Sequence, residues 1–147
     1  MNVWYFAYGS NVKLAQLKEG IGEFKLSKRS ILRNYKLVFN VYSKTWQGYT
    51  ANIQETGHYE DKVLGVVYHI TDTQLGKLQS FERTSPVEIS VELEDESEIK
   101  NAKTFLWSTS EQERKPPEAY RRIIEQGLIE HGYDSSTVRK IFDKTYA

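Results

Sequence analysis

Two short stretches of the sequence carry residue types suited to catalysis. In the first, Tyr8-Gly9-Ser10-Asn11, a glycine lies in a turn between an apolar run and a helical pattern, so successive main-chain N–H groups can point outward and bind an anion. Gly9 lets a ligand approach the backbone closely. Ser10 and Asn11 add side-chain donors, and Tyr8 can form a wall of the site. The alternative is an ordinary capped turn, because Gly-Ser-Asn turns are common.

The second stretch surrounds Glu82, near the predicted end of a helix whose apolar face comprises Leu75, Leu78 and Phe81. The negative end of the helix dipole and the apolar neighbours both disfavour the charged carboxylate, and they raise its pKa toward the range in which a general acid/base works. A positive charge on Arg83 acts in the opposite direction. The alternative is a solvent-facing glutamate paired with Arg83 or Lys77.

Other catalytic chemistries lack their sequence patterns. The three histidines, His58, His69 and His131, stand far apart without metal-ligand spacing, and we expect His69 in a strand and His131 at a helix end. Ser10 does not lie in a Gly-x-Ser-x-Gly elbow, and neither a P-loop nor Gly-x-Gly-x-x-Gly occurs. The absence of cysteine excludes disulfides, thiolate metal sites and cysteine nucleophiles. We therefore expect no metal site.

A basic and aromatic stretch leaves a second function open. It contains Lys25, Lys28, Arg29, Arg33, Lys36 and Lys44, interleaved with Tyr35, Phe39, Tyr42 and Trp46. On a small β-barrel such residues would form a stacking surface for single-stranded nucleic acid, which makes a non-catalytic module binding nucleic acid or a small ligand the alternative function. We favour the simpler interpretation, a sheet with aromatic side chains inside and basic side chains outside.

The first half of the chain predicts elements that position the Gly9 turn. Residues 3–8 form a short apolar and aromatic run typical of a buried strand. Residues 12–17 show near-helical apolar spacing up to Gly20, with Ser10 or Asn11 placed as the N-cap. Two β-branched and aromatic runs, residues 35–43 and 62–70, predict strands.

The second half predicts a helix, two strands and two further helices. Thr71-Asp72 offers cap oxygens to the helix that carries Glu82, and residues 87–93 alternate between apolar and polar side chains. We expect a partner strand at residues 102–107, across the acidic loop 94–101. A helix should run from Pro116-Pro117 to Gly132, and Asp134-Ser135-Ser136 should cap a last one through Phe142.

The composition indicates one folded domain. The chain has 147 residues, 39% of them hydrophobic and 13% aromatic, and 20 basic residues balance 20 acidic ones. This neutral balance argues against a dedicated nucleic-acid binder. No signal-peptide pattern and no membrane-length apolar run is present, so we expect a cytoplasmic protein. The order of elements predicts an α+β fold with a mostly antiparallel sheet, spanning residues 1–147 as one domain.

The stretch Tyr5-Phe6-Ala7-Tyr8-Gly9-Ser10-Asn11 resembles the N-terminal signature of the γ-glutamylcyclotransferase (AIG2-like) family. Other segments are similar to that family in the same order: residues 46–53, 65–68, 75–82, 117–120 and 127–132. In this alignment Glu82 falls on the family's catalytic glutamate. Arg83 departs from the pattern, since members usually have glycine after that glutamate, and residues 86–91 lack a tyrosine that members commonly carry.

The resemblance implies a barrel-like, mostly antiparallel sheet with flanking helices and an enzyme without a cofactor. The implied reaction is cyclisation of a γ-glutamyl group to 5-oxoproline with release of the acylated amine, as in glutathione metabolism. Glu82 would act as general acid/base, and the substrate would be bound by Tyr8, Gly9, Ser10, Asn11 and Tyr120. The implied partner is a small γ-glutamyl molecule. Membranes and nucleic acid are not expected, and homodimerisation is left open.

Overall fold

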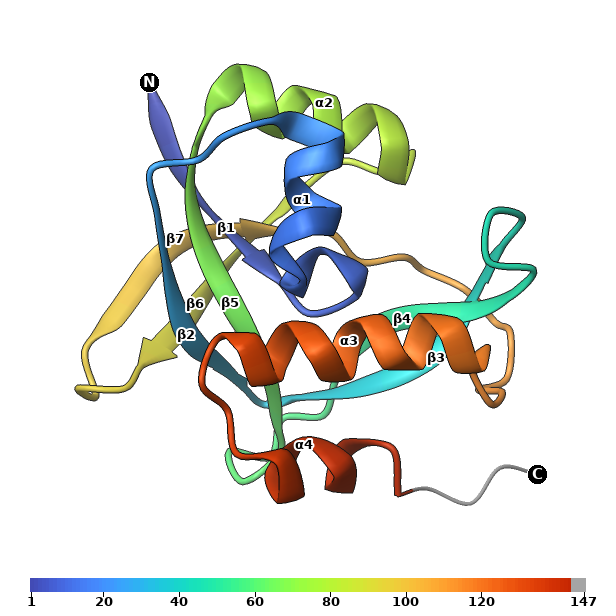
Figure 1. Ribbon diagram of the computed structural model, residues 1–147. Helices are drawn as coiled ribbons and strands as arrows, with labels where there is room; N and C mark the ends of the chain where they lie inside the picture. The colour runs from blue at the N-terminus through green and yellow to red at the C-terminus, as the bar shows by residue number, and fades with distance from the viewer. Residues whose placement is uncertain (144–147) are drawn as a thin grey trace.

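A computed structural model describes residues 1–143 and shows a five-stranded barrel flanked by helices (Figure 1). The barrel strands are β1 (Asn2–Ala7), β2 (Leu26–Arg33), β5 (Lys62–Thr71), β6 (Val87–Leu93) and β7 (Glu98–Thr104). They follow the order β1-β5-β2-β6-β7 with antiparallel neighbours, and β1 closes the barrel on β7 through a parallel pairing of Tyr5 with Lys103. The predicted α+β fold with a mostly antiparallel, barrel-like sheet is confirmed.

The other elements of residues 1–143 lie outside the barrel sheet. β3 (Tyr35–Ser43) and β4 (Gly48–Glu55) form a separate hairpin. The helices are α1 (Leu14–Ile21), α2 (Asp72–Glu82), α3 (Glu118–Glu130) and α4 (Ser135–Ile141), with a 3-10 turn η1 (Ser10–Val12) before α1. In Figure 1, α1 and α2 lie next to each other on one side of the molecule, whereas α3 runs beside the hairpin strands and above α4.

β5 forms the centre of the core because β1 and β2 flank it on both sides. Its Val66, Val67 and Tyr68 are completely buried, and burying a side chain of this size contributes roughly 1.5–3 kcal/mol. A Cβ atom at Gly65 would lie 2.4 Å from the carbonyl oxygen of Ala7. The glycine therefore allows β5 to pass close to β1, and this contact fixes the end of β1 from which the Gly9 turn departs.

Thr71 caps the N-terminus of α2, as predicted, and together with Gln74 it forms a capping box. The Thr71 hydroxyl accepts from the Gln74 N–H at 3.1 Å, and the Gln74 side-chain oxygen accepts from the Thr71 N–H at 3.0 Å. The Gln74 amide nitrogen also donates to the carbonyl oxygens of Ile21 and Glu23, at 3.1 and 2.6 Å. The cap thus starts α2 and ties it to the end of α1.

The helix after the Gly9 turn starts differently from the prediction. Ser10 and Asn11 do not cap α1, because residues 10–12 form the tighter η1 turn, in which the Lys13 N–H donates to the Ser10 carbonyl oxygen at 3.1 Å. α1 begins at Leu14 instead. A carboxylate oxygen of Glu130, on α3, accepts from the Leu14 N–H at 2.7 Å. A residue distant in sequence therefore satisfies the helix end that a local cap was expected to satisfy.

Two strands also differ from the prediction, β7 in its bounds and β2 in its presence. β7 covers residues 98–104 rather than 102–107, because the connecting turn is short: the Leu93 N–H donates to the Ser97 carbonyl oxygen, and Glu96 adopts φ 68°. β2 was not predicted, since its sequence Leu-Ser-Lys-Arg-Ser-Ile-Leu-Arg mixes charged residues with few apolar ones. The strands at residues 2–7, 35–43 and 62–71, and the helices α3 and α4 with the Asp134 cap, agree with the predictions.

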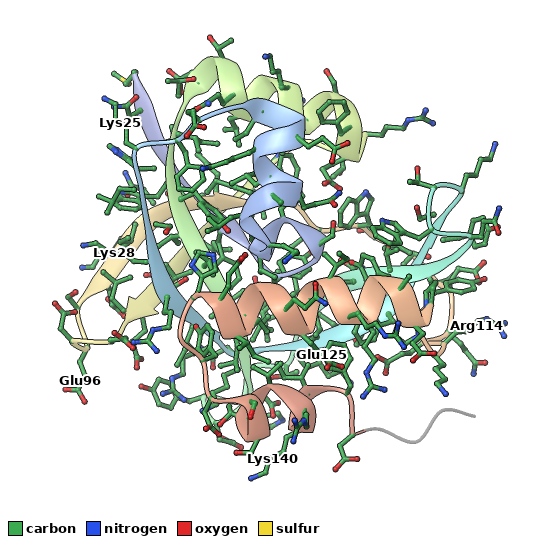
Figure 2. All side chains as sticks on the ribbon, viewed as in Figure 1. Lys25, Lys28, Glu96, Arg114, Glu125 and Lys140 are labelled. Atoms are coloured by element: carbon green, nitrogen blue, oxygen red, sulfur yellow. The ribbon has the colours of Figure 1, made fainter. Side chains whose placement is uncertain are left out.

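Charged side chains project from the periphery of the molecule, as the labelled Lys25, Lys28 and Glu96 show in Figure 2. The aromatic side chains of the basic stretch are divided, since Phe39 is completely buried and Tyr42 is 57% exposed. This arrangement agrees with aromatic residues inside and basic residues outside only in part. In residues 1–143, none of the helices is long and apolar enough to cross a membrane.

Candidate active site

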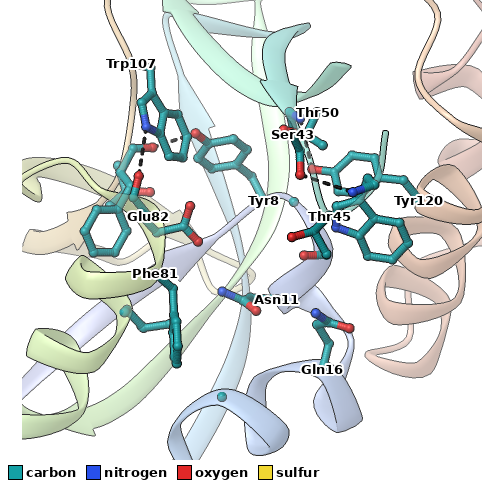
Figure 3. A pocket seen from close by; sticks show the side chains of 18 of the residues that line it. Tyr8, Asn11, Gln16, Ser43, Thr45, Thr50, Phe81, Glu82, Trp107 and Tyr120 are labelled. Carbon is teal, nitrogen blue, oxygen red and sulfur yellow. Dashed lines mark hydrogen bonds between the residues drawn. The ribbon is translucent and has the colours of Figure 1, made fainter. Parts of the chain in front are cut away.

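A cavity of about 410 Å³ opens where the Gly9 turn, α1, α2, the β3–β4 hairpin, the end of β7 and α3 converge (Figure 3). This volume lies in the range of small-molecule sites. The cavity is lined by Tyr5, Tyr8, Gly9, Ser10, Asn11, Gln16, Glu19, Gly20, Ser43, Thr45, Trp46, Thr50, Ala51, Leu78, Phe81, Glu82, Thr104, Phe105, Trp107 and Tyr120. The list contains every residue that the sequence predicted for the site.

Glu82 is the last residue of α2, and its carboxylate points into the cavity (Figure 3). Within residues 1–143 the carboxylate has neither an ion pair nor a hydrogen bond, so the expected alternative of a pair with Arg83 or Lys77 is wrong. Burial raises the pKa of Glu82 from 4.5 to about 7. The group can therefore both accept and release a proton near neutral pH.

Arg83 ends α2 in the left-handed conformation, with φ 58° and ψ 31°. Glycine adopts this conformation easily because it has no Cβ. This agrees with the glycine that the family pattern places directly after the glutamate. The Arg83 side chain is exposed, and burial is the cause that raises the pKa of Glu82. The expected opposing effect of the Arg83 charge is therefore absent from the site.

The main chain of the Gly9 turn faces the cavity with unpaired donors. Among residues 1–143, the N–H groups of Gly9 and Asn11 have no hydrogen-bond partner. Gly9 has φ −105°, so a left-handed conformation is not the reason for the glycine. The lack of space at this position favours glycine instead, because a Cβ atom would lie 2.9 Å from the Tyr120 hydroxyl oxygen.

Tyr8 and Tyr120 form walls of the cavity and are both buried. The Tyr8 hydroxyl donates to the carbonyl oxygen of Phe105 at 2.5 Å, so its proton is already engaged. The Tyr120 hydroxyl accepts from the Ala51 N–H at 2.9 Å, which fixes α3 against β4. Burial is the main cause that raises the pKa of each hydroxyl above its ordinary value of 10, so both stay protonated.

Two lining residues hold the predicted ones in place. The Trp107 indole N–H donates to the Glu82 carbonyl oxygen at 3.1 Å, and this bond fixes the end of α2 (Figure 3). The Asn11 side-chain nitrogen donates to the Tyr5 hydroxyl oxygen at 3.1 Å. The sequence analysis gave neither Tyr5 nor Trp107 a role. For Tyr5 the signal was its place on the predicted strand before the turn, whereas Trp107 had no local signal.

Aromatic rings form part of the cavity rim. Phe81 is 64% exposed, so the expected burial of the Leu75, Leu78 and Phe81 face is wrong at its last residue. Phe81 lines the cavity instead, where a Cβ atom at Gly20 of α1 would lie 3.6 Å from its ring. Trp46 packs edge-on against Tyr120, with ring centroids 5.2 Å apart.

The histidines lie outside the cavity lining. His69 is on β5, as predicted, and its ring lies 4.7 Å from that of Trp4. His131 follows the last turn of α3, also as predicted, and its Nε2 atom lies 3.1 Å from the Tyr68 hydroxyl. They have no contact with Glu82 or with the Gly9 turn in the structure of residues 1–143.

Comparisons with known proteins agree with this architecture. A solved structure described as gamma-glutamyl cyclotransferase is 25% identical, with a TM-score of 0.86 over 96% of this chain and 86% of the other. An uncharacterized protein from Homo sapiens, loc79017, is also 25% identical, with a TM-score of 0.86 over 99% of this chain and 92% of the other. YkqA from Bacillus subtilis is 25% identical with a TM-score of 0.82, and the match covers 97% of this chain but 55% of YkqA.

The search of curated protein sequences finds no significant match. A family model does match, however, over residues 5–127, which include the Gly9 turn, Glu82 and Tyr120. The predicted resemblance is thereby confirmed, and the chain belongs to the gamma-glutamyl cyclotransferase, AIG2-like family.

Proposed function

We propose that this protein is a γ-glutamylcyclotransferase that converts the γ-glutamyl group of a small substrate into 5-oxoproline and releases the amine. The observation that carries the proposal is the Glu82 carboxylate, unpaired within the described chain, with its pKa raised to about 7 by burial and its side chain facing the cavity of the Gly9 turn. Family membership supports the reaction type, and the volume of the cavity is suited to a small substrate.

The reaction needs one group that moves a proton between two nitrogens. The neutral α-amine of the γ-glutamyl group attacks its own γ-carbonyl carbon, and a C–N bond forms while Glu82 accepts a proton from the attacking nitrogen. The amide C–N bond then breaks, and Glu82 returns the proton to the leaving nitrogen. Glu82 ends as the carboxylate with which it began, so a single acid/base residue suffices.

The substrate itself supplies both the nucleophile and the electrophile. The protein must therefore hold a bent conformer rather than collect two reactants, and it needs no side-chain nucleophile. The walls of Tyr8 and Tyr120 restrict the space around Glu82 in a way that suits this task. Removal of water from the cavity strengthens each polar contact made there.

The α-carboxylate of the substrate needs hydrogen-bond donors, and in this cavity they must be neutral groups. No lysine or arginine of residues 1–143 lines the cavity. The unpaired main-chain N–H groups of Gly9 and Asn11, together with the Ser10 side chain, supply donors of the required kind. We assign these three residues to the α-carboxylate.

The proposal is tested by incubating the protein with γ-glutamyl amino acids, γ-glutamyl amines and glutathione, and measuring 5-oxoproline and the released amine. Glu82→Gln keeps the size of the side chain but cannot carry the proton, so turnover should be lost. Glu98→Gln, which changes an exposed carboxylate on β7, is the matched control and should retain activity. Formation of 5-oxoproline at the wild-type rate by Glu82→Gln would contradict the proposal.

A further inference from the structure

Tyr5 is a buried tyrosine of the cavity to which the proposed function gives no role. Its ring centroid lies 6.4 Å from that of Tyr68 and 6.0 Å from that of Phe105, and only 4% of the residue is exposed. The packing leaves little freedom for the ring. Its hydroxyl therefore occupies a fixed position at the cavity, as a preorganised catalytic donor must.

The hydrogen bond from Asn11 determines where the Tyr5 proton can go. The Asn11 side-chain nitrogen can only donate, so it engages a lone pair of the Tyr5 hydroxyl oxygen, at 3.1 Å. Among residues 1–143 the Tyr5 hydroxyl has no acceptor for its own proton. Burial and, next, the charge of Glu82 raise the pKa of Tyr5, so the proton stays on the oxygen and is available to a ligand.

The other tyrosines of the cavity are placed differently. The Tyr8 proton is engaged by the carbonyl oxygen of Phe105. The Tyr120 hydroxyl accepts from the Ala51 N–H, is also hydrogen-bonded to the Thr50 side chain and the Ser10 main chain, and lies on the side of the cavity opposite Glu82 (Figure 3). Tyr5 and Glu82 line the same cavity, and the charge of Glu82 adds to burial in raising the pKa of the Tyr5 hydroxyl.

In the proposed reaction, a hydrogen-bond donor near Glu82 would lie close to the γ-carbonyl group of the substrate. Glu82 must reach both the attacking and the leaving nitrogen, and both are bonded to the γ-carbon in the tetrahedral intermediate. The γ-carbonyl oxygen is bonded to the same carbon, and it becomes negative when the amine attacks. A neutral O–H donor held next to Glu82 can stabilise this oxygen, and such a donor acts most strongly in the transition state.

We propose that Tyr5 is a further catalytic residue, whose hydroxyl donates to the γ-carbonyl oxygen during cyclisation, and that the Asn11 side chain acts as a positioning residue that aims this hydroxyl. The inference rests on the proposed function and assigns a separate role to each group of the site. The Gly9 turn holds the α-carboxylate, Tyr5 stabilises the developing oxyanion, and Glu82 moves the proton. The Asn11 main-chain N–H belongs to the turn, whereas its side chain serves Tyr5.

The test is a double-mutant cycle on kcat with Tyr5→Phe and Asn11→Leu. Removing one oxyanion donor lowers kcat by roughly a hundredfold or more, so Tyr5→Phe should show this loss with KM almost unchanged. Asn11→Leu should lower kcat by a smaller factor. The double variant should match Tyr5→Phe alone, because Asn11 has no hydroxyl left to aim. Losses that multiply in the double variant would overturn the positioning role of Asn11.

Binding to an inactive background separates catalysis from substrate affinity. The dissociation constant of a γ-glutamyl substrate should be the same for Glu82→Gln as for Glu82→Gln combined with Tyr5→Phe, because the contact is made in the transition state. If adding Tyr5→Phe to Glu82→Gln weakened binding by the same factor by which Tyr5→Phe alone lowers kcat/KM, the catalytic role of Tyr5 would be overturned. The matched control is Tyr133→Phe, which removes a tyrosine hydroxyl bonded to the carbonyl oxygens of Ser30 and Gly65, outside the cavity, and should retain kcat.

The outcomes also distinguish this inference from the proposed function. If the wild type forms 5-oxoproline and Glu82→Gln does not, a Tyr5→Phe variant with kcat within about twofold of the wild type overturns the role of Tyr5 alone. If Tyr5→Phe does not fold, Asn11→Leu decides instead, because Asn11 is only partly buried. A lower kcat at unchanged KM supports the inference, and an unchanged kcat overturns it.

Discussion

Glu82→Gln should make the protein more stable at alkaline pH while it removes activity. Burial raises the pKa of this carboxyl to about 7 from an ordinary value of 4.5. A pKa difference of about 2.5 corresponds to about 3 kcal/mol, at 1.36 kcal/mol per pKa unit, and this is the free energy by which the ionised group destabilises the folded state. Glutamine has a similar size and no charge, so the variant does not bear this cost.

The sign of the pH dependence follows from proton binding. Between pH 4.5 and about 7, folded Glu82 binds more protons than Glu82 in the unfolded chain, so the free energy of unfolding falls as the pH rises through this window. Below the window the carboxyl is protonated in both states, and its contribution disappears. Above the window the full destabilisation is present.

Urea unfolding of the wild type, Glu82→Gln and Glu98→Gln across this range measures the effect. The advantage of Glu82→Gln over the wild type should be small at about pH 4 and should grow to as much as about 3 kcal/mol at about pH 8. Glu98→Gln, on the exposed surface of β7, should follow the wild-type curve. A constant difference between Glu82→Gln and the wild type at every pH would refute the argument that burial in the cavity raises the pKa.

Two further predictions concern glycines. Gly9→Ala should lower kcat/KM by roughly tenfold to a hundredfold in the 5-oxoproline assay, because its Cβ would lie 2.9 Å from the Tyr120 hydroxyl and must displace it; an unchanged rate would show that this spacing is unimportant. Gly65→Ala should lower the free energy of unfolding, measured in urea, by roughly 1–3 kcal/mol or more, because its Cβ would lie 2.4 Å from the Ala7 carbonyl oxygen. Gly76→Ala, whose Cβ meets open space on α2, should instead raise the free energy of unfolding by roughly 0.5–1 kcal/mol. Equal effects of Gly65→Ala and Gly76→Ala would contradict the close packing of β5 on β1.

Elements defined by local patterns could be predicted well. Thr71 forms the expected cap of α2, and the alternation of residues 87–93 places Ile89 and Val91 in the core. Local prediction was wrong where a distant residue decided the structure. Glu130 takes the place of the expected cap of α1, and β2 depends on pairing with β5 and β6 rather than on its own apolar pattern.

The candidate site shows the same division. The sequence by itself determined the chemical types: a turn with free main-chain donors at Gly9, a carboxyl at the end of a helix at Glu82, and a tyrosine on the closing helix at position 120. Only the tertiary structure brought these segments to one cavity and left Glu82 without a partner in the described chain. It also directed the Asn11 side chain toward Tyr5.

The physical reason is that capping and strand alternation arise from neighbours within a few positions in the chain, so the order of residues encodes them directly. The desolvation that raises the pKa of Glu82 depends on atoms from several elements, which become neighbours only when the barrel closes and the helices pack against it. The sequence therefore specified which groups could react, and the packing decided which of them meet.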